Sequence, residues 1–250
     1  MTNARAAKST REKAAELRAE AARAEAKRKQ LTITGAIAAL IVVILGSYLL
    51  ITKAKDDADA RTAAANASPA NLTNGGYLYG SSTAKVTLEL YEDFLCPACK
   101  NAEAANGTQI EEWVKDGTVK VIYKPVAILD HASTDDYSTR SLNAAAAVIN
   151  TKPEAFVAFH KALFDNQPAE GGPGLPDAKL VELAVAAGAD KATIESAITG
   201  KTFENWTVKA TEEFSKAGYN ATPTFVVNGT KVASSDPAVV KAAVDAAAKS

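Results

Sequence analysis

The stretch AKVTLELYEDFLCPACKNAEAANGTQIEEWVKDG, residues 84–117, decides the fold of this chain. Its first part alternates apolar and polar side chains, a period of two that predicts a β-strand over residues 84–94. The strand leads directly into CPAC, residues 96–99, and the segment that follows has the apolar spacing of a helix. The sequence therefore predicts a strand, a cysteine pair and a helix in immediate succession.

The place of the two cysteines in this unit predicts their chemistry. Proline is favoured at the first position of a helix, so we expect Cys96 at the N-cap and Cys99 in the first turn. Unpaired N–H groups and a partial positive charge at a helix N-terminus stabilise a thiolate at Cys96, whereas Cys99 is the more enclosed of the two. A strand–CxxC–helix order is the thioredoxin-type redox signature. We therefore expect Cys96 and Cys99 to be the catalytic residues.

Two other uses of the cysteine pair fit the sequence less well. A structural zinc site needs four ligands, and beyond the pair the chain offers only His131 and His160, neither at the spacing of a zinc knuckle. A disulfide that closed so short a loop would stabilise the fold little. A chain of 250 residues with two cysteines is also no scaffold of several disulfides. We expect neither a metal nor a cofactor.

The overall charge excludes one broad class of function. The chain has 28 Lys and Arg residues against 29 Asp and Glu, a formal net charge of −1. This balance lacks the basic excess of a dedicated nucleic-acid-binding protein.

One apolar run organises the N-terminal part of the chain. Residues 31–52, LTITGAIAALIVVILGSYLLIT, contain no charged side chain. As a helix this run spans roughly 33 Å, enough to cross a hydrocarbon core of about 30 Å. We therefore expect one transmembrane helix over residues 31–52, preceded by a basic tail of residues 1–30 and followed by a flexible linker of small polar residues, 53–76.

The charges on either side of the apolar run predict its orientation. Nine Lys or Arg residues precede it against four Glu, whereas basic and acidic residues are balanced just after it. The positive-inside rule then places the N-terminus in the cytoplasm and the rest of the chain outside it, in a single-pass protein of the cell membrane. A cleaved signal peptide is the alternative, but its apolar region is normally shorter, so we expect an uncleaved signal-anchor.

Residues 77–250 are predicted to form the folded domain. A second strand is expected over 118–126, followed by a mainly helical segment from about 130 to 217. His160 lies on an apolar helix face there and is expected to be a core or interface histidine, with a ligand or proton shuttle as the alternative. Asn228-Gly229 then predicts a hairpin after the strand TFVV, and a last helix follows Asp236.

The order of these elements resembles that of the DsbA-type thiol-disulfide oxidoreductases, most closely the membrane-anchored variants of Gram-positive bacteria. The likeness covers about residues 77–250. It is carried by DFLCPAC (93–99), AFHKALFDNQP (158–168) and ATPTFVVNG (221–229). The resemblance implies an α/β thioredoxin fold with a helical domain inserted before the strand that follows the cis-proline.

The resemblance also implies roles for residues around the cysteine pair. Thr222-Pro223 opens a strand, where a cis or a trans bond fits the sequence alone; by the likeness Pro223 is cis and faces the cysteines. Thr222 would offer backbone hydrogen bonds to an extended substrate segment. Asp93 matches a position common in the Gram-positive members, either for proton transfer or as a strand-end cap or loop contact.

Two departures from the family pattern concern acidity at the site. Pro97-Ala98 stands where the strongest oxidases have Pro-His, and alanine adds neither a positive charge nor a ring N–H, so Cys96 is expected to be less acidic than in those members. Leu90 stands where the family often has an acid.

Three acids flank that position instead: Glu89, Glu92 and Asp93. The sequence leaves open which of them, if any, handles the proton of Cys99.

The predicted function is that of an extracytoplasmic oxidoreductase that introduces disulfides into exported proteins through Cys96 and Cys99. By the resemblance, its partners would be exported substrates with free cysteines and a membrane reoxidant of the DsbB or VKOR type. The alternatives are an extracytoplasmic reductase or isomerase on the same fold, and a membrane-tethered chaperone or binding module.

Overall fold

The computed structural model describes most of the chain beyond the predicted linker. The described residues are 23, 27, 45, 47, 48, 51–53 and 67–249. The predicted basic tail and most of the predicted span, 31–52, lie outside them. Among the described residues, no helix is both long enough and apolar enough to cross a membrane. The chain divides into two units, 1–61 and 62–250, and the second is the folded domain.

A five-stranded sheet forms the centre of this domain. Its strands are β1 (Tyr77–Tyr79), β2 (Val86–Tyr91), β3 (Val119–Tyr123), β4 (Thr224–Val227) and β5 (Thr230–Lys231). Their order in the sheet is β1-β3-β2-β4-β5, with β2 and β3 parallel and the other neighbours antiparallel. The strand that leads into the cysteines, β2, is therefore the central one.

The sequence pattern of β2 explains its central place. Val86, Leu88 and Leu90 are fully or almost fully buried, and the polar residues between them are partly exposed. This is the alternation from which the strand was predicted, and it fixes which face of the sheet packs on the core. The strand ends at Tyr91, before the predicted limit of 94, because the chain turns there toward the cysteines.

Two helices pack on the sheet outside the inserted segment. Helix α2 (Pro97–Lys115) contacts β3, and α8 (Pro237–Lys249) contacts β2 and β4. Asp236 caps the start of α8, where its carboxylate accepts from the backbone N–H of Ala238 across 2.9 Å.

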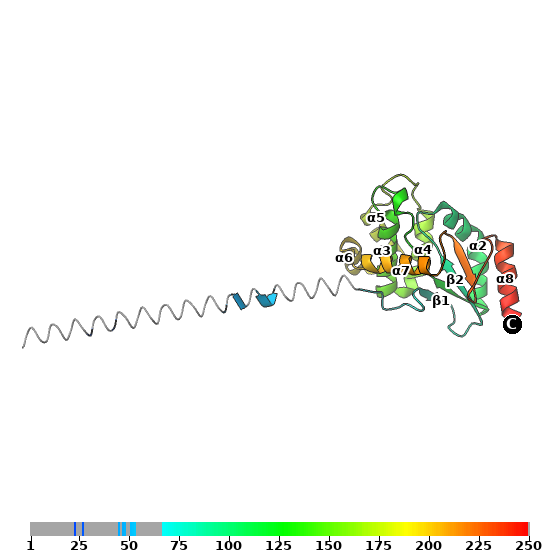
Figure 1. Cartoon of the computed structure of the whole chain (residues 1–250), viewed down its shortest axis with the longest axis horizontal. Helices are drawn as coiled ribbons and strands as arrows, with labels where there is room; N and C mark the ends of the chain where they lie inside the picture. Colours follow the sequence, from blue (N-terminus) through cyan, green and yellow to red (C-terminus); the bar gives the residue numbers. More distant parts are fainter. Residues whose placement is uncertain are drawn as a thin grey trace, which may run out of the picture. The chain divides into compact units, whose positions relative to one another are not determined.

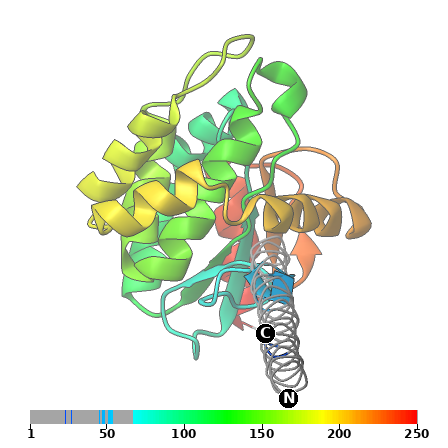
Figure 2. The same ribbon diagram turned by 90° about the vertical axis from the view of Figure 1, so that its left-hand side faces the viewer.

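The inserted segment between β3 and β4 is helical, as predicted. Its elements are the short 3₁₀ turns η1 (Asp130–Ala132) and η2 (Pro153–Ala155) and the helices α3 (Tyr137–Thr151), α4 (Phe156–Asp165), α5 (Asp177–Ala186), α6 (Lys191–Thr199) and α7 (Glu204–Lys216). Helix α3 contacts each of the other four helices. Figures 1 and 2 show these helices gathered on one side of the sheet. The run of small buried side chains in α3, such as Ala144–Ala147, allows this close packing.

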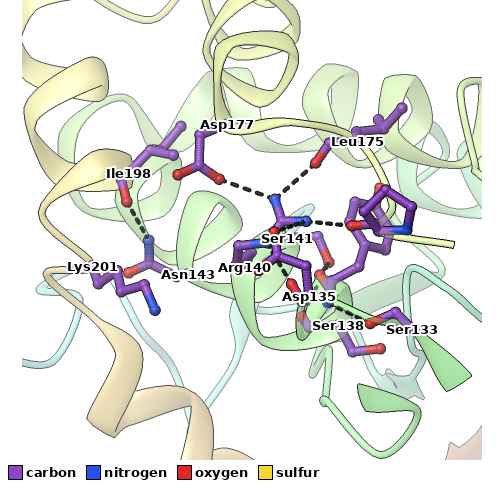
Figure 3. A network of polar contacts seen from close by, with 12 residues as sticks. Ser133, Asp135, Ser138, Arg140, Ser141, Asn143, Leu175, Asp177, Ile198 and Lys201 are labelled. Atoms are coloured by element: carbon purple, nitrogen blue, oxygen red, sulfur yellow. Dashed lines mark hydrogen bonds and ion pairs between the residues drawn. The ribbon is translucent and has the colours of Figure 1, made fainter. Parts of the chain in front are cut away.

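A buried arginine fastens the long loop between α4 and α5 (Figure 3). The side chain of Arg140 is 9% exposed, and its guanidinium donates to the carbonyl oxygens of Pro173 and Leu175 across 2.6 and 2.7 Å. It also pairs with the carboxylate of Asp177 across 3.0 Å. These charge-assisted bonds hold a loop rich in Gly and Pro in one conformation.

The start of the domain differs from the sequence prediction. The backbone N–H of Ala70 donates to the side chain of Asn150, and the amide of Asn71 donates to the carbonyl oxygen of Ile149. The last residues of the predicted linker, 53–76, therefore lie against α3 and belong to the domain. The short strand β1 that follows was not predicted, because three half-buried residues give too little alternation to be recognised.

Candidate active site

The turn between β2 and α2 is organised by one buried carboxylate. Asp93 is fully buried. One of its oxygens accepts from the backbone N–H of Leu95 and the hydroxyl of Ser138, across 2.9 and 2.7 Å. The other accepts from the backbone N–H groups of Ile128 and Leu129, across 2.8 and 3.0 Å.

Four hydrogen bonds on one side chain join β2, α3 and the loop after β3. Burial raises the pKa of Asp93 to about 6, and these four bonds oppose the rise. Of the two roles that the sequence left open for Asp93, the geometry matches the loop contact.

The cysteine pair stands where the sequence predicts it. Cys96 is the N-cap of α2, with extended backbone angles, and Pro97 occupies the first turn. The backbone N–H of Cys99 donates to the carbonyl oxygen of Cys96 across 3.1 Å, which places both residues at the helix start. Both are free thiols; Cys96 is 7% exposed and Cys99 is fully buried. Cys96 is therefore the sulfur that a substrate reaches, and Cys99 is the enclosed one.

The surroundings of the two sulfurs drive their pKa values apart. The pKa of Cys96 falls to about 6, chiefly because the Cys99 side chain hydrogen-bonds the Cys96 sulfur. The Thr222 side chain and the backbone N–H groups of Cys99 and Ala98 lower this pKa further, whereas burial acts to raise it. Burial raises the pKa of Cys99 far above its usual range, and the charges of Cys96 and Glu92 raise it further. At neutral pH the reduced pair therefore holds one thiolate, on Cys96, and one thiol, on Cys99.

The strand that begins at residue 224 brings a second backbone to the cysteines. The Thr222–Pro223 peptide bond is cis, as the resemblance implied. The carbonyl oxygen of Thr222 lies 3.5 Å from Sγ of Cys96. Pro97 and Ala98 are exposed, and Thr222 and Pro223 are half-buried. A surface for an incoming chain therefore surrounds the accessible sulfur.

One residue of the site was missed by the sequence reasoning. The side-chain amide of Gln167, in the loop after α4, donates to the carbonyl oxygens of Phe94 and Cys96 across 3.0 and 2.9 Å. Gln167 lies within AFHKALFDNQP, one of the stretches on which the family resemblance is based, and this similarity was the one sequence feature that pointed to it. A single glutamine in a loop after a helix belongs to no periodic pattern or motif that would mark it as a site residue.

The acids around Leu90 separate into different environments. Glu89 is at the surface side of β2 and pairs with Lys124 across 3.0 Å. Glu92 is 2% exposed, and its carboxylate lies 2.8 Å from Nε2 of the equally buried His160. His160 is thus the core histidine that its apolar helix face predicted, with a buried carboxylate as its partner.

This arrangement of an acidic thiol at the N-cap position of a helix, a buried second thiol and an adjacent cis-proline backbone is that of a thiol-disulfide oxidoreductase. A family model described as thioredoxin matches residues 72–246. The chain belongs to the thioredoxin family.

Solved structures narrow the class further. The crystal structure of reduced DsbA from Mycobacterium tuberculosis is 35% identical, with a TM-score of 0.60 over 70% of this chain and 98% of that one. The reduced disulfide bond oxidoreductase DsbG from the same organism is 36% identical, with a TM-score of 0.59 over 69% of this chain and 92% of that one. The chain is a protein-disulfide oxidoreductase of the DsbA type.

A longer protein contains a similar region. The serine/threonine-protein kinase PknE of Mycobacterium tuberculosis is 32% identical over 175 residues, which is 67% of this chain and 31% of the kinase. This chain thus spans about a third of the length of the curated relatives that it matches.

Proposed function

We propose that this protein is a membrane-anchored, extracytoplasmic oxidase that introduces disulfides into exported proteins. The observation that carries the proposal is the pair of opposite pKa shifts at the cysteines: the pKa of Cys96 falls to about 6 and that of Cys99 rises. A stabilised Cys96 thiolate favours the reduced form of the pair, and a pair whose reduced form is stabilised is an oxidant of other thiols.

The reaction begins with the Cys96–Cys99 disulfide. A substrate thiolate attacks Sγ of Cys96, the bond between the two enzyme sulfurs breaks, and Cys99 leaves and takes up a proton. A second substrate thiolate then attacks the substrate sulfur of the mixed disulfide and displaces Cys96 as a thiolate. Two electrons pass from the two substrate thiols to the enzyme pair, which ends reduced while the substrate ends as a disulfide.

The carbonyl oxygen of Thr222 and the exposed surface at Pro97 and Ala98 support recognition of an extended substrate segment. Backbone hydrogen bonds of this kind are independent of the substrate's side chains. The proposal therefore fits an enzyme that acts on many exported proteins with free cysteines.

The location is proposed from the sequence. Residues 31–52 are long and apolar enough to anchor the chain, and the basic tail before them favours a cytoplasmic N-terminus. Outside the cytoplasm thiol oxidation is productive. Reoxidation there requires a membrane partner, and we propose one of the DsbB or VKOR type.

The reduction potential of the pair tests the oxidase proposal. Equilibration of the full-length protein in detergent with glutathione buffers is expected to give a potential well above that of thioredoxin, about −270 mV. We expect an intermediate value on the oxidising side, because Ala98 adds no positive charge beside Cys96. A value near that of thioredoxin contradicts the oxidase and favours a reductase.

A second experiment tests the isomerase alternative. Refolding of a scrambled-disulfide substrate, compared with oxidation of the reduced substrate, separates the two activities. Faster oxidation supports the oxidase, and rescue of scrambled substrate alone supports the isomerase.

The last alternative, a chaperone or binding module, is tested in cells. The double variant Cys96→Ser, Cys99→Ser removes the redox chemistry and keeps the helical insertion. Loss of disulfides in exported proteins is expected, whereas full cellular function of the double variant contradicts catalysis. Mass spectrometry of the membrane-extracted protein tests the anchor, since a mature N-terminus beyond residue 52 means that the span is cleaved.

A further inference from the structure

Three side chains of metal-binding types converge where the end of β2 meets α2 and α4. Glu92 follows β2, Glu103 is on α2 and His160 is on α4. A carboxylate oxygen of each glutamate and a ring nitrogen of His160 all lie within 4.8 Å of one another. Glu92 and His160 are 2% and 1% exposed, and Glu103 is half-buried. One nitrogen and two oxygen atoms from three different elements therefore share one enclosed space.

The spacing of these three atoms is close to that around a single metal ion. Zn²⁺ binds nitrogen and carboxylate oxygen at about 2.0–2.2 Å, so two ligands of one tetrahedral ion are about 3.4 Å apart. Nε2 of His160 and a carboxylate oxygen of Glu92 are 2.8 Å apart, and the widest separation in the cluster is within 4.8 Å. Small side-chain movements, outward for the first pair and inward for Glu103, bring all three atoms to bonding distance of one ion.

The charge of the cluster also favours a cation. Two ionised carboxylates leave a net negative charge even when the imidazole is protonated. Among the described residues, no lysine or arginine forms an ion pair with Glu92 or Glu103. Four aromatic rings lie around the imidazole, with centroids 4.7 to 5.7 Å away: Phe94, Tyr123, Phe156 and Phe164. Because uncompensated charge is costly in such surroundings, a divalent cation would stabilise the cluster.

The carboxylate of Glu103 is available as a ligand. No hydrogen bond or ion pair joins it to another residue in the part of the chain that the structure describes, although one of its oxygens lies in the cluster. By contrast, Asp93 accepts four hydrogen bonds and Glu89 pairs with Lys124. The structure therefore accounts for these two neighbouring acids without a ligand, but not for Glu103.

The imidazole of His160 is placed to bind through Nε2. This nitrogen faces Glu92, whereas the buried Nδ1 has no hydrogen-bond partner among the described residues. An imidazole that binds a metal is neutral, so Nε2 releases its proton and Nδ1 carries the remaining one. Most metal-binding histidines donate that second proton to an acceptor. Since His160 has aromatic rings there instead, we expect an ion that binds reversibly and is removed by a chelator.

An ion has a route to the cluster from solvent. Glu103 lines a surface hollow of about 280 Å³ between α2 and α4, together with Lys100, Glu111, Lys161 and Asp165. Water in this hollow is able to supply a fourth ligand, as in zinc sites that have three protein ligands.

The types of the ligand atoms select the ion. Ca²⁺ and Mg²⁺ take oxygen ligands almost exclusively, so the imidazole disfavours both. Copper(I) prefers thiolate and thioether sulfur, which the cluster lacks. One imidazole and two carboxylates are an ordinary combination for Zn²⁺.

We propose that Glu92, Glu103 and His160 bind one Zn²⁺ ion and that this ion links the end of β2 to α2 and α4. The site uses neither sulfur of the cysteine pair and does not depend on the proposed oxidase function. The sequence prediction of no metal considered only cysteine and histidine as ligands. It could not count two carboxylates that tertiary packing brings to His160.

The test measures Zn²⁺ binding by the full-length, untagged protein in detergent. The protein is used with Cys96 and Cys99 joined as a disulfide, so that no thiolate competes for the metal. After treatment with EDTA and removal of the chelator, Zn²⁺ is titrated in a calorimeter. We expect one ion per chain and a rise in Tm that EDTA reverses, because an ion that binds the folded state stabilises it. Absence of saturable binding overturns the proposal.

Two matched variants locate the ion. Glu103→Gln keeps the size of the side chain and removes a charged ligand, and we expect at least about 100-fold weaker binding, since even the loss of a residue that only orients a ligand costs up to that factor. Glu111→Gln makes the same change on the same helix, at an exposed position that lines the same hollow, and is expected to bind like the wild type. Equal affinities in the two variants would identify an adventitious surface ion and overturn the proposal.

The two histidines of the chain allow the nitrogen ligand to be identified without a variant of the buried site. In protein labelled with ¹⁵N-histidine, Zn²⁺ is expected to shift the ring nitrogens of His160 and to leave those of His131 unchanged. The variant His131→Gln, at an exposed position, assigns the two signals. A shift confined to His131 overturns the proposal, as does a rise in Tm with Ca²⁺ equal to that with Zn²⁺.

Discussion

The side-chain amide of Gln167 donates to the carbonyl oxygen of Cys96 across 2.9 Å, which ties the helical insertion to the first active-site cysteine. The same nitrogen donates to the carbonyl oxygen of Phe94 across 3.0 Å. Both carbonyls belong to the turn between β2 and α2. The insertion therefore supports the geometry of the reactive turn as well as covering it.

Replacement of Gln167 by leucine is expected to weaken this support. The change keeps the size of the side chain but leaves two carbonyl oxygens of the turn without their donor, so we expect a loss of about 1–3 kcal/mol in the free energy of unfolding. Urea unfolding measures the loss, and alkylation of Cys96 should reveal a changed thiolate reactivity. Asn166→Ala, which touches a carbonyl of its own helix, is the control. If Gln167→Leu and the wild type have equal stability and equal rates of Cys96 alkylation, the Gln167 amide does not stabilise the turn between β2 and α2.

The low pKa of Cys96 is expected to depend on its partner sulfur. The hydrogen bond from Cys99 is the largest cause of the shift to about 6. Cys99→Ala should therefore raise the pKa of Cys96 toward its ordinary value, and Cys99→Ser, which keeps a hydroxyl donor, should raise it less. The ultraviolet absorbance of the thiolate as a function of pH measures both. An unchanged pKa in Cys99→Ala would assign the shift to the helix N-terminus instead.

The reactive unit was predictable from the sequence because its determinants are local. The alternation of Val86, Leu88 and Leu90 specifies a buried strand, and Pro97 at the helix start fixes which cysteine caps the helix. The hairpin at Asn228-Gly229 followed for the same reason. Each of these signals lies within a few residues of the structure that it determines.

The contacts that complete the site could not be predicted from the sequence because they join segments that are far apart in it. The hydrogen bond between Gln167 and Cys96 spans a sequence separation of 71 residues, and that between His160 and Glu92 spans 68. No local pattern marks which acid of a cluster is buried and which is paired at the surface. The choice between Glu89 and Glu92 depends on how β2 ends and where α4 packs, and that is set by the tertiary structure.

Asp93 is expected to be essential for stability. Asp93→Asn replaces one carboxylate oxygen by an NH₂ group, which then faces donors such as the N–H groups of Ile128 and Leu129 or the hydroxyl of Ser138. Buried donors without an acceptor cost about 1–3 kcal/mol each, so we expect a loss of about 2–4 kcal/mol in urea unfolding. Asp165→Asn, which breaks an exposed pair with Lys161, should cost less than about 1 kcal/mol. Equal losses in the two variants would contradict the structural role of Asp93.

The stability difference between the dithiol and disulfide forms is expected to depend on pH. In the dithiol form the pKa of Cys96 is about 6, against 9.0 for the unperturbed thiol. Because the folded pKa is the lower one, this group contributes stability that is present above pH 9 and is lost as the pH falls through 6. The disulfide form has no such titration, while Asp93 titrates in both forms and cancels in the difference. Above about pH 9 the raised pKa of Cys99 reverses the trend, because the unfolded chain then loses its proton first.

We therefore expect the dithiol form to gain stability relative to the disulfide form between pH 6 and 9, by on the order of 2 kcal/mol after allowance for the solvent contact of Cys96. Urea unfolding of both forms at a series of pH values measures this gain. The Cys96→Ser variant, whose hydroxyl does not ionise in this range, is the matched control and should show no such gain in comparison with the disulfide form. A pH-independent difference in the wild type would mean that the Cys96 thiolate is not stabilised by the fold, and it would remove the driving force that makes the pair an oxidant.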